Sequence, residues 1–195
     1  MKLLLASKST ARRRMLEAAG VPFEAAEAPL DEEEAKRTFG GLGAAALAAA
    51  LAEAKARSVT ADATALVLGS DQTLEGDDGT MLSKPKSRED AFEQLRSLSG
   101  RSHQLHSAAA IVEAGQTVWT GTESVTLWVR PLSDAFLRRY LDLEYEAIRW
   151  SVGGYRIEGP GVQLFERIRG SHFAILGMPL LPLLNYLRER GVVEH

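Results

Sequence analysis

Asp71 is the residue of this chain whose type and position most clearly suggest chemistry. It ends the apolar run Ala65–Ser70, and Lys84 follows it after a turn. A carboxylate at the tip of a strand suits a hard divalent cation, which bridges phosphate oxygens and activates water. A lysine supplies a compact positive charge to the same phosphates. The pair therefore indicates a metal-dependent polyphosphate site. The competing interpretation is an aspartate at a turn and an unrelated surface lysine.

The polar segment at residues 7–14 is a second candidate anion site. It has the sequence Ser-Lys-Ser-Thr-Ala-Arg-Arg-Arg and follows the short apolar run Leu3–Ala6. A turn from a strand into a helix exposes backbone N–H groups and the positive end of the helix dipole. Serine hydroxyls and guanidinium groups add donors that suit phosphate oxygens. The alternative is a helix N-cap followed by a solvated basic face, and no Walker A or G-x-G-x-x-G spacing is present.

Three other segments carry groups with chemical potential. The acidic run Asp31–Glu34 is typical of a solvated helix start, and Lys55 is most simply a lysine on a helix surface. Residues 153–161 are rich in glycine, which lets a backbone approach a flat ligand closely. Among them, Glu158 can accept hydrogen bonds from a base edge that presents N–H groups. The alternative for this segment is an ordinary mobile turn.

The composition is that of a globular protein, with 45% hydrophobic and 25% charged residues among 195. This length fits one domain over residues 1–195. A formal net charge of -3 gives no general affinity for nucleic acid, so an anion site must be a local cluster. The absence of cysteine excludes thiolate metal sites and is compatible with a reducing cytosol. No apolar stretch reaches membrane-spanning length and no signal peptide is recognisable, so we expect a cytoplasmic protein.

Strands and helices must position these groups, and the apolar pattern predicts both. We expect strands at Leu3–Ala6, Ala65–Ser70, Ala108–Glu113, Thr117–Val129 and Val162–Ile168. We expect helices from Ser7–Thr10 to about Ala19, over Ala44–Val59, from Ser87 to Gly100, from Ser133 through Leu141, and over Leu181–Arg190. A turn signal at residues 76–79 makes Thr73–Lys84 a hairpin. The mixture of strands, helices and hairpins predicts an α/β protein with a mixed sheet.

Five segments, in order along the chain, resemble the motifs of the Maf family of nucleoside triphosphate pyrophosphatases. Residues 5–13 are similar to the opening L-A-S-x-S-P-x-R-R motif, residues 69–73 to the strand-end motif, and residues 84–85 to G-K-P. Residues 95–103 resemble L-x-x-L-S-G-x-x-H, and residues 154–180 resemble the closing glycine-rich pattern. The resemblance covers nearly the whole chain. It implies a two-lobed Maf/ITPase-like α/β fold, with a mixed, curved sheet and a central cleft for a nucleotide.

The resemblance also implies roles for individual residues. Asp71 resembles the family's general base and metal-associated carboxylate, and Glu32 resembles an acidic residue that helps to hold the metal. The metal implied is Mg²⁺ or Mn²⁺. Lys84 completes the implied catalytic set with these two carboxylates. The residues that resemble the substrate-binding set around the phosphates are Ser7, Arg12, Arg13, Lys55 and Lys84.

Family members divide by base preference at three positions, which here are Ala11, Gln72 and Glu158. The branch that acts on dTTP and UTP has Arg, Thr and Gln there, and the branch that acts on N7-methyl-GTP has Trp, Gln and Glu. This chain resembles the second branch at two of the three positions. A guanine edge would donate to Glu158, and Gln72 would adapt its amide to the same ligand. Three residues depart from the family pattern: Ala11 replaces an aromatic, Thr10 a proline and Ser83 a glycine.

The predicted function is hydrolysis of a nucleoside triphosphate to the monophosphate and pyrophosphate, on modified nucleotides such as N7-methyl-GTP. Water would attack the α-phosphorus with assistance from Asp71. The alternatives are a pyrophosphatase that prefers dTTP or UTP, a phosphatase that releases orthophosphate, and a nucleotide-binding regulator of cell division without significant turnover. The joint presence of Glu32, Lys55, Asp71 and Lys84 favours an enzyme. A homodimer is the candidate assembly, and no nucleic-acid or membrane partner is expected.

Overall fold

The computed structural model of the chain describes residues 1–194. These residues divide into two compact units. The first unit contains Met1–Gln72, His106–Ser124 and the residues from Ser171 onward, and the second contains Thr73–Leu105 and Val125–Gly170. Each unit is therefore assembled from segments that are distant in the sequence.

A single mixed sheet contains the seven strands found within residues 1–194. Their order is β2-β1-β3-β5-β6-β7, and β4 pairs with β3. The strands are β1 (Leu3–Ala6), β2 (Glu24–Ala25), β3 (Leu66–Gly76), β4 (Met81–Leu82), β5 (Ser102–Glu113), β6 (Gln116–Val129) and β7 (Phe165–Arg169). β1 is parallel to both β2 and β3, whereas β4 is antiparallel to β3 and β7 is antiparallel to β6. The predicted α/β class with a mixed sheet is confirmed.

Three helices of the first unit begin and end close to the predicted residues: α1 (Thr10–Ala18), α3 (Ala44–Ser58) and α7 (Leu180–Glu189). For α2 (Glu32–Thr38) the sequence suggested only a helix start, and α6 (His172–Ile175) was not predicted. The hydroxyl of Ser9 caps α1 by accepting from the backbone N–H of Arg12. Gly20 follows the end of α1 with φ 67°, the left-handed conformation that glycine adopts without strain. The local signals were therefore sufficient for α1, α3 and α7.

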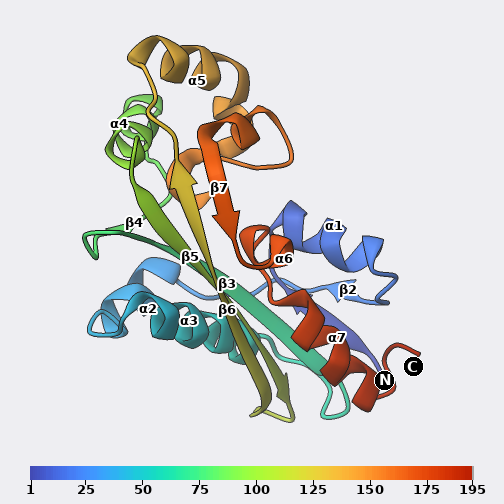
Figure 1. The fold of residues 1–195 in the computed structure, drawn as a ribbon. Helices are drawn as coiled ribbons and strands as arrows, with labels where there is room; N and C mark the ends of the chain where they lie inside the picture. The colour runs from blue at the N-terminus through green and yellow to red at the C-terminus, as the bar shows by residue number, and fades with distance from the viewer. Residues whose placement is uncertain (195) are drawn as a thin grey trace. The chain divides into compact units, whose positions relative to one another are not determined.

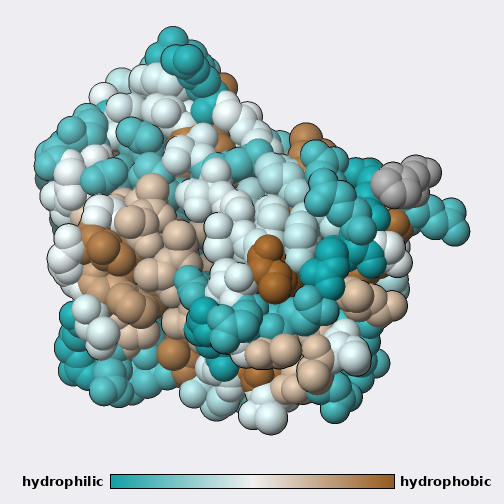
Figure 2. Space-filling model, turned by 90° about the horizontal axis from the view of Figure 1, so that it is seen from below, coloured by the Kyte–Doolittle hydropathy of each residue, from teal (hydrophilic) through white to brown (hydrophobic). Residues whose placement is uncertain are grey.

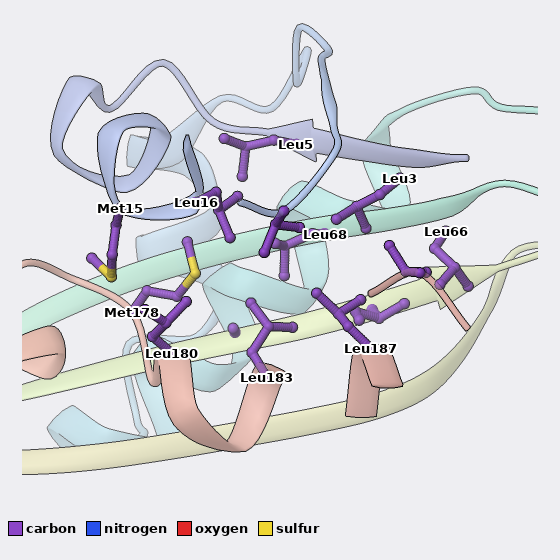
Figure 3. Close-up of a cluster of buried hydrophobic side chains, with 14 residues drawn as sticks. Leu3, Leu5, Met15, Leu16, Leu66, Leu68, Met178, Leu180, Leu183 and Leu187 are labelled. Carbon is purple, nitrogen blue, oxygen red and sulfur yellow. The ribbon is translucent and has the colours of Figure 1, made fainter. Parts of the chain in front are cut away.

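The main core of the first unit lies between the sheet and helices α1 and α7 (Figure 3). Its labelled members are Leu3, Leu5, Met15, Leu16, Leu66, Leu68, Met178, Leu180, Leu183 and Leu187. Full burial of one such side chain stabilises the fold by about 1.5–3 kcal/mol. Side chains alternate along a strand, so Val67 belongs to a different cluster, with Ala56 of α3.

Small side chains bring α3 close to the other face of the sheet. Ala48 and Ala52 pack against Ala108 and Ala110 of β5. A Cβ atom added to Gly69 of β3 would lie 2.1 Å from the carbonyl oxygen of Ala52, so only glycine fits there. In Figure 1, α2 and α3 lie on one side of the long strands and α7 on the other. This close approach allows a long side chain of α3 to reach the next inward-facing residue of β3.

The prediction that a strand ends at Ser70 and a separate hairpin begins at Thr73 is wrong. β3 continues through this region without a break, so Asp71 lies inside the strand and not at its tip. The polar residues suggested a strand end, but their groups are paired inside the fold. The Ser70 hydroxyl, for example, lies 2.8 Å from the carbonyl oxygen of Ala108 and 2.9 Å from that of Gly177. β4 pairs back on β3, as the hairpin prediction requires.

Two helices of the second unit test the predicted boundaries. α4 (Arg88–Leu98) has Ser87 as its N-cap, as expected. α5 (Asp134–Ile148) continues well beyond the predicted end at Leu141. Glu144 lies in that extension, and it is buried although it is charged. A charged residue on the buried face interrupts the apolar pattern, which is why the sequence suggested an earlier end.

Two further strands differ from their predicted bounds. The strand expected at Val162–Ile168 is only half present, because residues up to Leu164 form a short 3₁₀ helix and β7 follows it. Pro160 begins this helix, and its fixed φ and missing N–H favour that position. β5 begins at Ser102 rather than Ala108, because polar residues at its start, including His103, are buried in the sheet.

The surface carries mainly hydrophilic residues on the face that Figure 2 presents, with hydrophobic residues in separate patches. The exposed large hydrophobic residues come from many elements and include Leu42, Met81, Val118, Leu143, Trp150 and Leu181. Among residues 1–194, no helix has both the length and the apolar content that a membrane span requires.

Candidate active site

Three charged side chains of the first unit meet at Lys55. Its Nζ atom lies 2.9 Å from Oε1 of Glu32 and 3.0 Å from Oδ1 of Asp71. The lysine is buried, with only 7% of its surface exposed. The interpretation of Lys55 as a helix-surface lysine is therefore wrong. The structure joins three residues for which the family resemblance implied a catalytic or phosphate-binding role.

The elements that carry these residues explain the meeting. α3 buries the stripe Leu47, Leu51 and Lys55, which are spaced by one turn, so Lys55 points to the interior. This spacing was the signal that could have placed Lys55 inside. Asp31 caps α2 by accepting from the backbone N–H groups of Glu33 and Glu34, each at 3.0 Å. The acidic run is thus a helix start, as predicted, but its first helical residue pairs with a buried lysine.

Asp71 faces α3 because of its position on β3. Gly69 and Asp71 share one face of the strand, and a Cβ atom on Gly69 would clash with the backbone of α3. Ser70 points the opposite way and holds the carbonyl oxygens of Ala108 and Gly177. The Asp71 side chain is 13% exposed, so its carboxylate is largely withdrawn from water and held by charge.

Arg12 is buried beside this cluster and hydrogen-bonds to two backbone carbonyl oxygens. Its Nε donates to the carbonyl oxygen of Gly177 and its Nη1 to that of Ser70, both at 2.8 Å. Burial lowers the pKa of the guanidinium from its usual value, and the nearby charges of Asp71 and Glu32 oppose that shift. An arginine keeps its charge under such conditions. Arg12 therefore stiffens the segment around Ser70 and adds a positive charge to the carboxylate site.

The other predicted residues of the first helix differ in exposure. Ser7 is half-buried, and its hydroxyl accepts from the backbone N–H of Ser9 at 3.2 Å. Arg13 is exposed, and Ala11 is half-buried. The predicted anion segment thus presents one buried guanidinium, two exposed guanidinium groups and a helix start, which together can attract a negatively charged group.

Gln72 is fixed by its amide nitrogen. Nε2 lies 2.9 Å from the Ser107 hydroxyl, 2.9 Å from the carbonyl oxygen of Ala174 and 3.1 Å from that of Ile175. Carbonyl oxygens only accept, so the nitrogen faces them in the structure, and the expectation that Gln72 adapts its amide to a ligand stays a prediction. These three contacts do not use the Oε1 atom of the amide. Gln72 therefore offers a ligand an acceptor and no donor.

Lys84 and Glu158 belong to the second unit, and both are exposed. Glu158 stands in a loop that two neighbouring residues anchor. The Tyr155 hydroxyl lies 2.6 Å from Nε2 of His103, and burial lowers the pKa of this histidine from 6.5 to about 4. The loop that carries Glu158 is therefore attached to the unit through its first residue.

A part-buried ion pair anchors the same loop one residue later. Arg156 donates from Nε to Oε2 of Glu144 at 2.6 Å and from Nη2 to Oε1 at 3.2 Å, a bidentate pair. A Cβ atom added to Gly161 would lie 2.2 Å from the carbonyl oxygen of Arg156, which explains the glycine. Sequence reasoning missed Glu144, although its spacing from Leu137 and Leu141 on α5 was a signal.

The carboxylates of Glu32 and Asp71 suit a metal such as Mg²⁺, which takes only part of its ligands from the protein. Within residues 1–194, no three His, Cys, Asp or Glu side chains gather to form a complete metal site. Magnesium is held by one or two carboxylates together with substrate phosphates and water. Glu32 and Asp71 converge on one cation, the Lys55 ammonium, so their oxygens are directed at a shared position.

Comparison with known proteins identifies the family. The model of the Maf-like protein family matches residues 2–190. A nucleoside triphosphate pyrophosphatase of Sphingopyxis alaskensis is 46% identical, and a 7-methyl-GTP pyrophosphatase of Rhizobium meliloti is 47% identical; each match covers 98% of both chains. A nucleoside triphosphate pyrophosphatase of Rhodopseudomonas palustris is 48% identical over 98% of this chain and 95% of its own. The chain belongs to the Maf-like family.

These matches bear on the predictions made from the sequence. The predicted family is confirmed, and the relatives named above are hydrolases. The solved structure of a dITP/XTP pyrophosphatase of Mycobacterium abscessus covers 98% of this chain and 96% of its own at 17% identity, with a TM-score of 0.46, which is too low to support a conclusion.

Proposed function

We propose that the chain is a pyrophosphatase that hydrolyses a nucleoside triphosphate to the monophosphate and pyrophosphate. The observation that carries the proposal is the convergence of Asp71 and Glu32 on buried Lys55, in a chain whose relatives bear that name. Two carboxylates and a cation in one place suit a reaction that needs both metal binding and neutralisation of phosphate charge. We propose that residues 1–195 act as one catalytic domain.

The roles of the residues follow from their chemistry. Asp71 takes the proton of the water that attacks the α-phosphorus, and Glu32 shares with it the binding of Mg²⁺ or Mn²⁺. When bound, the metal supplies charge neutralisation on the phosphate oxygens and lowers the pKa of water. The cationic and hydroxyl groups that would neutralise or bind the triphosphate are Ser7, Arg12, Arg13, Lys55 and Lys84. Positive charge matters here because negative charge grows on the leaving pyrophosphate.

Guanine-type triphosphates, with N7-methyl-GTP foremost, are the substrates that we propose. Glu158 accepts from the N1–H and the exocyclic amine of guanine, which uracil and thymine do not present together. The fixed amide of Gln72 adds an acceptor, which also favours a base edge with N–H groups. Ala11 provides no aromatic ring for stacking, so we expect broader selectivity than in relatives with tryptophan there. The 7-methyl-GTP pyrophosphatase relative supports this choice.

The experiment is a panel of N7-methyl-GTP, GTP, UTP and dTTP, with products identified by phosphorus NMR. Pyrophosphate release supports the proposal, whereas orthophosphate release identifies a general phosphatase and no turnover identifies a binding protein. The Glu158→Gln variant should lower kcat/KM for guanine-type substrates more than for UTP. Glu166→Gln, which neutralises an exposed glutamate of β7, serves as the matched control. A wild type that prefers UTP or dTTP contradicts the assigned base.

A further inference from the structure

Lys55 occupies the place where two metal-binding carboxylates meet. Its ammonium contacts Glu32 and Asp71 at 2.9 and 3.0 Å, and its side chain is only 9% exposed. Asp71 is 13% exposed and Glu32 36% exposed, so the cluster opens to water on the Glu32 side. An ammonium in this position neutralises much of the negative charge that would otherwise attract a free cation.

The cluster is balanced only while a cation holds the two carboxylates together. Like charges at close range repel, and burial makes an unpaired carboxylate costly. Lys55 meets that need in the structure, and a divalent metal would meet the same need. Both cations use the same carboxylate oxygens, so one ammonium and one metal cannot make all of these contacts at once.

We propose that Lys55 holds the carboxylate pair closed to free divalent metal and releases it when a triphosphate arrives. The inference rests on the proposed function and concerns the order in which ligands enter. Phosphate oxygens offer the ammonium a new partner of higher charge, so Lys55 turns from the carboxylates to the phosphates. Glu32 and Asp71 then receive the metal together with the nucleotide. Free metal therefore binds weakly, and metal with nucleotide binds well.

The lysine also has a purely structural interpretation, in which it stays on the carboxylates throughout. The two interpretations differ in what removal of the ammonium does. A structural lysine contributes only stability, so its loss loosens the cluster and does not favour metal. A competing lysine, when removed, leaves two converging carboxylates without their cation, and their affinity for free metal rises.

The test measures Mn²⁺ binding without nucleotide, by electron paramagnetic resonance of free Mn²⁺, in wild type and in Lys55→Met. We expect the variant to bind Mn²⁺ at least about tenfold more tightly. Removal of one nearby positive charge changes the interaction energy of a cation by about this much, even in a site that contains water. Lys36→Met is the matched control, since Lys36 pairs with Glu33 on α2 and does not contact the cluster. Its Mn²⁺ affinity should stay within about twofold of wild type, as expected for an exposed ion pair.

Two further measurements keep the proposal testable if Lys55→Met folds poorly. In wild type, water-proton relaxation should detect a ternary complex of protein, Mn²⁺ and a GTP analogue whose α,β-bridge is methylene, but little binary protein–Mn²⁺ complex. Tight binary binding by wild type overturns the proposal, as does a folded Lys55→Met with unchanged Mn²⁺ affinity. Neither result depends on turnover, whereas failure of the proposed function shows as absent pyrophosphate release.

Discussion

The replacement of Asp71 by asparagine tests the centre of the proposed chemistry. The amide keeps the shape of the carboxylate, and its Oδ1 can still accept from Lys55 Nζ, which lies 3.0 Å away. Lys55 also keeps its second partner, Glu32, at 2.9 Å. The general base and one of two metal ligands are lost together. A positioned general base contributes about 10²–10⁴-fold, so we expect kcat to fall at least about a hundredfold.

The same replacement should leave the fold largely intact. A hydrogen bond to a charged group contributes about 1.5–3 kcal/mol, and the amide retains part of it. The assay is pyrophosphate release at saturating Mg²⁺, beside thermal unfolding followed by circular dichroism. Asp62→Asn, which neutralises an exposed aspartate before β3, is the control and should retain activity. A folded Asp71→Asn protein with near wild-type kcat would refute the assignment of Asp71.

Ser107→Ala removes an acceptor 2.9 Å from the Gln72 amide. We expect a loss of about 1 kcal/mol in unfolding free energy and a weaker preference for guanine over uracil in kcat/KM. Ser107→Thr should restore both. Glu144→Gln weakens the part-buried pair with Arg156. We expect a higher KM for guanine-type substrates and a smaller change in kcat, and unchanged selectivity would contradict a positioning role. His103 is neutral when folded because burial lowers its pKa from 6.5 to about 4. The unfolded chain therefore binds more protons between these pH values, and stability falls as pH drops through 6.5. Between pH 7 and pH 5, the unfolding free energy measured with denaturant should fall by about 2 kcal/mol more in wild type than in His103→Gln.

Elements with local signals were predictable from the sequence. Serine caps at Ser9, Ser87 and Ser133 each precede a helix, because a side-chain oxygen satisfies a backbone N–H only a few residues away. The alanine-rich run of α3 forms a helix for the same local reason. Errors arose where a polar residue inside an element looked like its end, as at Asp71 of β3 and Glu144 of α5. Asp71 and Glu144 can lie inside their elements because each pairs with a charged residue from another part of the chain, Lys55 and Arg156 respectively.

The order of the amino acids was enough to identify the family and the chemical types of the candidate site. Asp71, Glu32 and Lys55 are candidates because they fall in or between motifs that follow one another in the family's order. That order could not show that the three side chains share one place, because the two carboxylates come from a helix start and a mid-strand position. It also left open which atom of Gln72 faces a ligand.

The packing of helices on the sheet set the surroundings and the direction of these groups. A lysine on a helix is exposed unless the opposing surface approaches closely, and here Gly69 permits that approach to α3. Lys55 is buried with two carboxylates for this reason. Gln72 presents its oxygen because the carbonyls of Ala174 and Ile175 take its nitrogen. Such orientations depend on which groups meet across the fold, and the local sequence does not determine those contacts.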